Sequence, residues 1–175
     1  QRDKRSAMQN GDDHDWLRQG GTSSADVAKS YDDWAVTYNE TLAEWDYRAP
    51  GDAARPLRTT APSDALILDA GCGTGGLMTK LGVGAQVFGF DIAAETAGFW
   101  PEQNRATAWR ASVNAIPLAS ESMDVVFCIN VFECDDVDPA TAYGELWRIT
   151  KPGGILILSM PAHYWLGNET HDAAI

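Results

Sequence analysis

The pattern of apolar and polar positions divides the chain into two parts that meet near residue 63. In the first part, apolar residues recur at spacings of three and four, which places them on one face of a helix. This face comprises Tyr31, Trp34, Tyr38, Leu42 and Trp45. Pro50-Gly51 closes the region, and a second short helix is predicted over residues 53–58. Residues 1–24 are polar with several Gly and Ser, so we expect a flexible tail followed by a helical cap over residues 25–62.

Short apolar runs alternate with helix-length segments in the second part of the chain. Strands are predicted over residues 65–69, 86–91, 107–111, 123–130 and 155–160. Helices are predicted between them over residues 77–81, 92–100 and 141–149. Alternation of strands and helices implies parallel strands joined by right-handed crossovers. We therefore expect residues 63–175 to form one α/β domain, a doubly wound and mainly parallel sheet with helices on both faces.

The first predicted strand runs directly into a glycine-rich turn, Gly71-Cys72-Gly73-Thr74-Gly75-Gly76. Glycine lets the backbone turn tightly and lets a ligand approach without meeting a Cβ atom. In open α/β sheets, ligands bind beyond the carboxyl ends of the strands. Asp91 ends the next strand, where its carboxylate can accept hydrogen bonds from both hydroxyls of a ribose. The turn and Asp91 together predict a site for a ligand that contains a ribose.

The glycine turn by itself does not identify the ligand. Gly71, Gly73 and Gly76 satisfy the fingerprint of dinucleotide-binding proteins, in which a pyrophosphate binds at a helix N-terminus. Asp69, two residues before the first glycine, favours a different ligand because a carboxylate would oppose a pyrophosphate. The same carboxylate suits an ammonium or sulfonium group. An NAD(P)-dependent oxidoreductase stays open as an alternative, as does a tight turn without any ligand.

Four segments in register carry a family resemblance. Residues 66–76 and Phe88-Gly89-Phe90-Asp91 resemble the first two motifs of the class I S-adenosylmethionine-dependent methyltransferases. Ser122-Met123-Asp124-Val125-Val126 and Lys151-Pro152-Gly153-Gly154 resemble the segments around the fourth and fifth strands of that family. The chain is most similar to the small-molecule type related to ubiquinone and menaquinone methyltransferases. The resemblance implies a Rossmann-like fold and in-line methyl transfer from S-adenosylmethionine to an oxygen, nitrogen or carbon nucleophile of a small molecule.

The resemblance also implies which residues bind the cofactor. They are Tyr31, Tyr38, Asp69, Gly71, Cys72, Gly73, Gly75, Asp91, Ile92, Ser112, Val113 and Asn130. Asp69 and the glycine backbone would hold the methionine portion, Asp91 the ribose, and Ile92 would lie against the adenine. Ser112 departs from the family, which usually has an acid there, so its bond to the adenine amino group would be weaker. Asn130 would offer a backbone carbonyl to the cofactor's amino group.

The candidate catalytic residues follow the last two predicted strands in the sequence. Methyl transfer requires a positioned nucleophile and, for oxygen or nitrogen acceptors, is helped by a base. His163 and Glu133 lie where they could face the pocket, although a rim-loop histidine and a helix-starting acid are the ordinary alternatives. His171 and Asp172 lack metal-ligand spacing with His163, so no metal is expected.

Charge and cysteine content narrow the class of protein. The net charge is −12 at pH 7, and few Lys or Arg follow Leu66, so no basic face for nucleic acid is expected. The three cysteines form no CxxC pair and are expected to be reduced thiols. No apolar run approaches the ~20 residues that cross a membrane. We expect a cytoplasmic enzyme with a small-molecule acceptor and no nucleic-acid or membrane partner; its oligomeric state, a homodimer included, stays open.

The end of the sequence departs from the family pattern. The family continues past the fifth strand with a helix and an antiparallel strand pair, whereas this chain stops at Ile175. An edge as apolar as Ile155-Leu156-Ile157-Leu158 would invite aggregation if it were uncovered. We expect either that another segment covers this edge or that the C-terminal strands are missing. A protein that keeps the cofactor site without transferring a methyl group therefore stays open as a further alternative.

Overall fold

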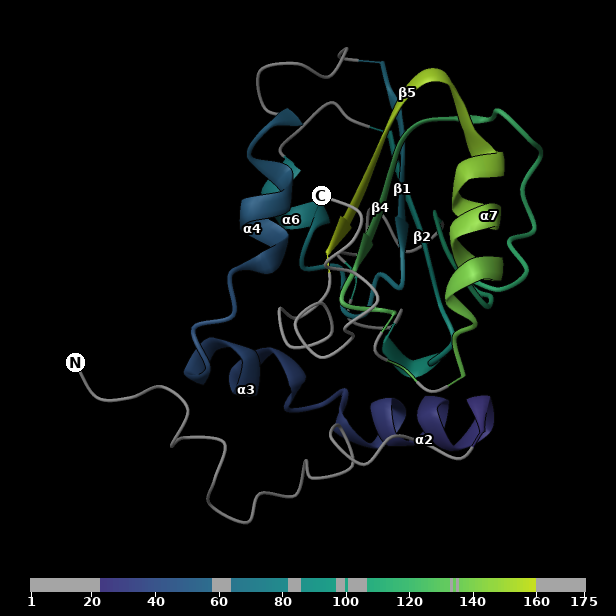
Figure 1. Ribbon diagram of the computed structural model, residues 1–175. Coiled ribbons are helices and arrows are strands. Elements are labelled where there is room, and N and C mark those ends of the chain that lie inside the picture. The colour runs from purple at the N-terminus through teal and green to yellow at the C-terminus, as the bar shows by residue number, and fades with distance from the viewer. Residues whose placement is uncertain are drawn as a thin grey trace, which may run out of the picture.

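The computed structural model describes residues 23–57, 64–81, 86–96, 100, 107–132, 134 and 136–159. Its centre is a five-stranded parallel sheet in the order β3-β2-β1-β4-β5 (Figure 1). The strands are β1 (Leu66–Ala70), β2 (Gln86–Asp91), β3 (Ala108–Arg110), β4 (Met123–Ile129) and β5 (Thr150–Ser159). The chain builds one half of the sheet outward from β1 and then crosses to build the other half. This arrangement confirms the predicted doubly wound α/β fold.

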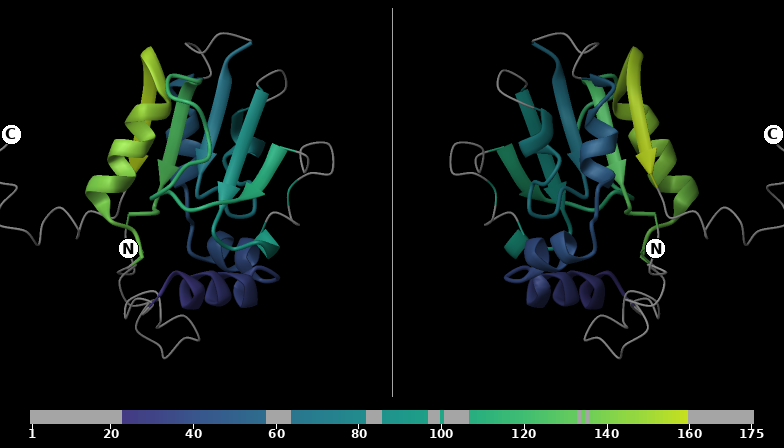
Figure 2. Two further views of the ribbon diagram at one scale, coloured as in Figure 1. Left: turned by 90° about the vertical axis from the view of Figure 1, so that its right-hand side faces the viewer. Right: turned by 90° about the vertical axis from the view of Figure 1, so that its left-hand side faces the viewer.

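Helices cover both faces of the sheet, as the two views of Figure 2 show. α7 (Pro139–Ile149) lies on one face, and α4 (Ala49–Ala54) and α6 (Met78–Leu81) lie on the other. α2 (Ser24–Trp34) and α3 (Tyr38–Glu44) lie across the carboxyl ends of the strands. The sequence predicts a helical cap over residues 25–62; of the three cap helices, α2 begins one residue earlier, and α3 and α4 lie inside this range. Within the described residues, none of the helices is long and apolar enough to cross a membrane.

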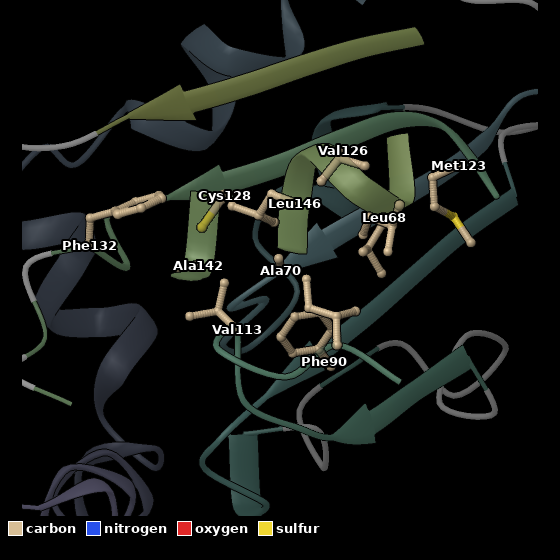
Figure 3. Packing of buried hydrophobic residues seen from close by; sticks show 12 residues of the cluster. Leu68, Ala70, Phe90, Val113, Met123, Val126, Cys128, Phe132, Ala142 and Leu146 are labelled. Carbon is tan, nitrogen blue, oxygen red and sulfur yellow. The ribbon is translucent and has the colours of Figure 1, made fainter. Parts of the chain in front are cut away.

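Alternating side chains of the central strands build a hydrophobic cluster on each face. Leu68 and Ala70 of β1 and Cys128 of β4 pack beneath α7, together with Ala142 and Leu146 of that helix (Figure 3). The alternate residues of the same strands, Ile67, Val125 and Phe127, pack with residues of α4 and α6. Successive side chains of a strand point to opposite faces, so apolar residues at consecutive positions require cover on both sides.

The predicted N-terminal helix is two helices in the structure. α2 ends at Trp34 and α3 begins at Tyr38, with a turn that contains the β-branched residues Val36 and Thr37. Branched side chains lower helix propensity, which favours a break there. The predicted aromatic face nevertheless forms one cluster, because the Trp34 ring centroid lies 4.6 Å from that of Tyr38 and 5.7 Å from that of Trp45.

Two proline segments also differ from the prediction. Pro50 lies in the first turn of α4 and does not close the region before it. Proline is accepted there because the first N–H groups of a helix have no partner within the helix. Lys151-Pro152-Gly153-Gly154 lies inside β5 and does not form a separate turn. The pairing register shifts there, since Met123 pairs with Thr150 whereas Val125 pairs with Ile155.

Asp124 connects three strands at the amino ends of the sheet. Its carboxylate accepts hydrogen bonds from the backbone N–H of Leu66 in β1 (2.9 Å) and from the ammonium of Lys151 in β5 (2.7 Å). The Lys151 bond, followed by the Leu66 bond, lowers the pKa of Asp124. The two family-like segments that contain Asp124 and Lys151 thus help to set the positions of the strands. Residues 1–22 of the predicted tail, part of the helix predicted over residues 92–100, and everything after residue 159 lie outside the described residues.

Candidate functional site

A pocket lies at the carboxyl ends of the strands, between the glycine turn and the cap helices. It contains about 440 Å³ of empty space, part of it open to solvent. Its wall comprises Tyr38, Asn39, Leu42, Tyr47, Pro50, Asp69, Gly71, Cys72, Gly73, Thr74, Gly76, Leu77 and Ile129. The location agrees with the general rule that ligands of open α/β sheets bind beyond the carboxyl ends of the strands.

The glycine turn follows β1 in a conformation that needs glycine. Gly71, Gly73 and Gly75 have φ values of +75°, +48° and +82°, in the left-handed region. A Cβ atom at Gly71 would also overlap the side chain of Val131. The N–H groups of Gly71 and Cys72 both donate to the carbonyl of Phe90 at the end of β2, at 2.8 and 3.0 Å. The turn is therefore fixed to the neighbouring strand and presents backbone to the pocket.

Among the described residues that line the pocket, Asp69 is the one with an ionisable acidic side chain. Its residue is 3% exposed and lies one position before the end of β1. Within the part of the chain that the structure describes, no donor forms a hydrogen bond with its carboxylate. Burial, and secondly the charge of Asp91, raise the pKa of Asp69 to about 7. A cationic group in the pocket would favour its ionised form, since opposite charges stabilise each other most strongly where water is excluded.

Asp91 lies behind the glycine turn, at the end of β2, and does not line the pocket. One carboxylate oxygen accepts the N–H of Gly73 (2.8 Å) and the other accepts the N–H of Ala93 (3.0 Å). Burial raises the pKa of Asp91, and the bonds from Ala93 and Gly73 oppose this shift. These two bonds fix the direction of the carboxylate next to the turn.

Two hydrogen bonds attach α2 and α3 to the loops that follow β1 and β2. Asn39 accepts a bond from the hydroxyl of the buried Thr74 in the glycine turn (2.7 Å). Asp32 accepts a bond from the N–H of Glu95, just after β2 (2.9 Å). These bonds hold the cap helices across the carboxyl ends of the strands, beside the pocket.

A third attachment joins the cap helices to the other half of the sheet. The Tyr47 hydroxyl, between α3 and α4, accepts a bond from the Asn130 side chain (2.9 Å). Asn130 directly follows β4 with φ +55°, and its side-chain oxygen accepts a bond from the Ser159 hydroxyl at the end of β5 (3.0 Å). Tyr47 thus connects the wall of the pocket to the carboxyl ends of β4 and β5.

The structure brings some of the predicted cofactor residues together and separates others. Tyr38, Asp69, Gly71, Cys72 and Gly73 line the pocket. The other predicted residues within the described ranges do not line it; they are Tyr31, Gly75, Asp91, Ile92, Ser112, Val113 and Asn130. Ser112 accepts a bond from the N–H of Asn114 (3.2 Å), and Val113 is buried in the cluster beneath α7. The predicted catalytic residues, His163 and Glu133, lie outside the described residues.

Sequence reasoning missed two aromatic residues of this region. Tyr47 lines the pocket, but its spacing of two from Trp45 takes it off the predicted apolar face of the helix. Trp100 is 1% exposed and donates a hydrogen bond from its indole N–H to the carbonyl of Gly73 (3.2 Å). Its sequence position suggested only the end of a helix. The only signal for Trp100 in the sequence is that it is a large aromatic residue. Such a residue can fill the space that glycines such as Gly75 and Gly89 leave.

Comparison with known proteins identifies the family. Residues 68–158 match the family model described as "Methyltransferase domain". The malonyl-[acyl-carrier protein] O-methyltransferase of Pectobacterium atrosepticum is 35% identical over 55% of this chain and 38% of its own length. Human methyltransferase-like protein 27 is 31% identical over 74% of this chain and 55% of its own length. The chain belongs to the methyltransferase domain family.

A solved structure extends the similarity to the fold. An S-adenosylmethionine-dependent methyltransferase of Thermotoga maritima superposes with a TM-score of 0.57 at 23% identity, covering 73% of this chain and 58% of that one. The fold is therefore that of the S-adenosylmethionine-dependent methyltransferases, and the family implies use of this cofactor. The chain spans about half or less of the length of the curated relatives named above.

Proposed function

We propose that this protein binds S-adenosylmethionine and transfers its methyl group to a small-molecule acceptor by in-line displacement. The observation that carries the proposal is Asp69, a buried carboxylate in the pocket wall directly before a glycine turn. Membership of the methyltransferase domain family supports the reaction class. Buried Asp69 also argues against the NAD(P)-dependent alternative, because a pyrophosphate would bring negative charge next to it.

The residues of the pocket fit the proposed cofactor. Asp69 would hold the ammonium of the methionine portion, and its charge also suits the nearby sulfonium. A Cβ atom at Gly73 would lie 3.8 Å from the Tyr38 hydroxyl, so a side chain at Gly73 would fill the space between the turn and α3. Asp91 lies behind the turn and outside the pocket wall; it would accept the ribose hydroxyls with the lone pairs that Gly73 and Ala93 leave unused. When bound, S-adenosylmethionine supplies a methyl group that the sulfonium has already activated for attack.

The acceptor would enter from the side of β4 and β5. In this proposal the cofactor lies at the ends of β1 and β2, next to Asp69 and Asp91. The other half of the sheet is then left for the nucleophile. Tyr47 and Ile129 form the pocket wall on that side. His163 and Glu133 remain our candidates for a base. The name of the Pectobacterium relative supports an oxygen nucleophile, and we further propose a cytoplasmic location and no nucleic-acid or membrane partner.

A transfer assay with methyl-labelled S-adenosylmethionine tests this function. The acceptors should include carboxylic acids, acyl thioesters, phenols and amines, with heat-denatured protein as the blank. We expect label in one acceptor class, and we expect Asp69→Ala to abolish it whereas Asp64→Ala, at an exposed position, leaves it unchanged. Binding of the cofactor without label in any acceptor would instead support a cofactor-binding protein without transferase activity.

A further inference from the structure

Trp100 packs against the glycine turn without lining the pocket. Its six-membered ring lies beside Gly89 of β2, where any side chain would overlap it. The five-membered ring lies 3.0 Å from the position that a Cβ atom would take at Gly75. These two glycines leave the space that the indole fills, and the indole is 1% exposed. The glycine turn therefore packs against a rigid aromatic ring.

The indole also fixes the orientation of Gly73. Its N–H donates to the Gly73 carbonyl (3.2 Å), while the Gly73 N–H donates to Asp91 (2.8 Å). Gly73 has φ +48° and no side chain, so its backbone has more conformational freedom than that of any other residue type. Trp100 on one side and Asp91 on the other hold the two peptide groups that flank this glycine.

We propose that Trp100 is a positioning residue of the cofactor site. It keeps the glycine turn in the conformation that receives the methionine portion of S-adenosylmethionine, and through Gly73 it keeps Asp91 oriented toward the ribose. The inference rests on the proposed function, but Trp100 itself touches no atom of the ligand in this role. A turn that is ordered before binding loses less conformational freedom when the ligand arrives, which increases affinity.

The substitution Trp100→Phe tests this role because it keeps a ring and removes the N–H. We expect calorimetry to show about 3- to 10-fold weaker binding of S-adenosylhomocysteine, the size expected for one lost hydrogen bond. Hydrogen exchange of residues 71–77 in the ligand-free protein should become faster. Trp109→Phe is the matched control, since the buried indole N–H of Trp109 has no partner among the described residues. It should leave both measurements unchanged.

A second substitution separates positioning from a general loss of packing. Gly89→Ala alone should weaken ligand binding, because its methyl group overlaps the six-membered ring of Trp100. Combined with Trp100→Phe, whose ring is smaller, the overlap with the ring is relieved, and the close approach to the Cβ atom of Cys72 (2.9 Å) remains in both variants. The double variant should therefore bind S-adenosylhomocysteine more tightly than Gly89→Ala alone, although both carry the same alanine.

The two proposals fail in different ways. Wild-type affinity and unchanged exchange of residues 71–77 in Trp100→Phe would overturn the positioning role. A wild-type protein that does not bind S-adenosylhomocysteine would overturn the proposed function. In that case the exchange measurement still decides whether Trp100 holds the turn, because it needs no ligand.

Discussion

Asp69 and Asp91 repel each other across the gap between β1 and β2. They lie at the carboxyl ends of neighbouring parallel strands, where Asp69 is in register with Gly89, two residues before Asp91. Burial contributes most to the raised pKa of Asp69, about 7, and the charge of Asp91 adds to it. The ligand-free site thus contains two carboxyl groups that a cationic ligand would stabilise in their ionised forms.

Ligand affinity should depend on pH because of this pair. The ammonium of S-adenosylhomocysteine favours ionised Asp69, so affinity should rise about tenfold from pH 6 to pH 8 as the group loses its proton. Calorimetry in two buffers of different ionisation enthalpy would measure the accompanying proton release. Asp69→Asn should weaken binding and remove the pH dependence. A wild-type affinity that is constant over this range would contradict the assignment of Asp69.

Folding stability should show the opposite trend with pH. An aspartate carboxyl in the unfolded chain has a pKa of 3.8, whereas the pKa of Asp69 in the fold is about 7. Between these two pH values the folded protein holds a proton that the unfolded chain releases. Stability from this group therefore falls as pH rises through that window. The urea midpoint of the wild type, minus that of Asp69→Asn, should decrease from pH 5 to pH 7. A difference that stays constant over this range would show that Asp69 is already ionised in the ligand-free fold.

The glycine turn should not tolerate a side chain at Gly71. Gly71→Ala combines a left-handed backbone with an overlap against Val131 and should cost on the order of 1–3 kcal/mol of the free energy of unfolding. Gly144→Ala, on the exposed face of α7 with open space around it, is the matched control and should gain about 0.5–1 kcal/mol. Equal effects of the two substitutions in urea unfolding would mean that the turn is not constrained as described.

The contact between Tyr47 and Asn130 should be measurable as a coupling energy. Tyr47→Phe removes this hydrogen bond and should cost about 0.5–1.5 kcal/mol. Asn130→Ala removes it together with the bond from Ser159 and places alanine at φ +55°, so it should cost more. The double variant should cost less than their sum, since the bond can be lost only once. Tyr143→Phe, on the exposed face of α7, serves as the control for loss of a tyrosine hydroxyl. Strict additivity would show that the bond contributes nothing to attachment of the cap helices.

The strands that the sequence predicts correctly are those determined by the local pattern of apolar residues. β2 has its predicted bounds, and the strong apolar run of β4 differs by one residue, because continuous apolar segments have few alternatives to a buried strand. The break between α2 and α3 and the shifted register near Lys151 depend on packing that no local window contains. The position of Asp69 in the pocket wall follows from the sequence, since a carboxylate directly before a glycine turn lies at the carboxyl end of the first strand. Tyr47 and Trp100 were missed because tertiary contacts alone bring them to the site.

A calorimetric titration of the wild-type protein with S-adenosylhomocysteine and, separately, NADH tests the central claim most directly. We expect binding of S-adenosylhomocysteine at one site, no response to NADH, and weaker binding after Asp91→Ala. Binding of NADH with no response to S-adenosylhomocysteine would contradict it.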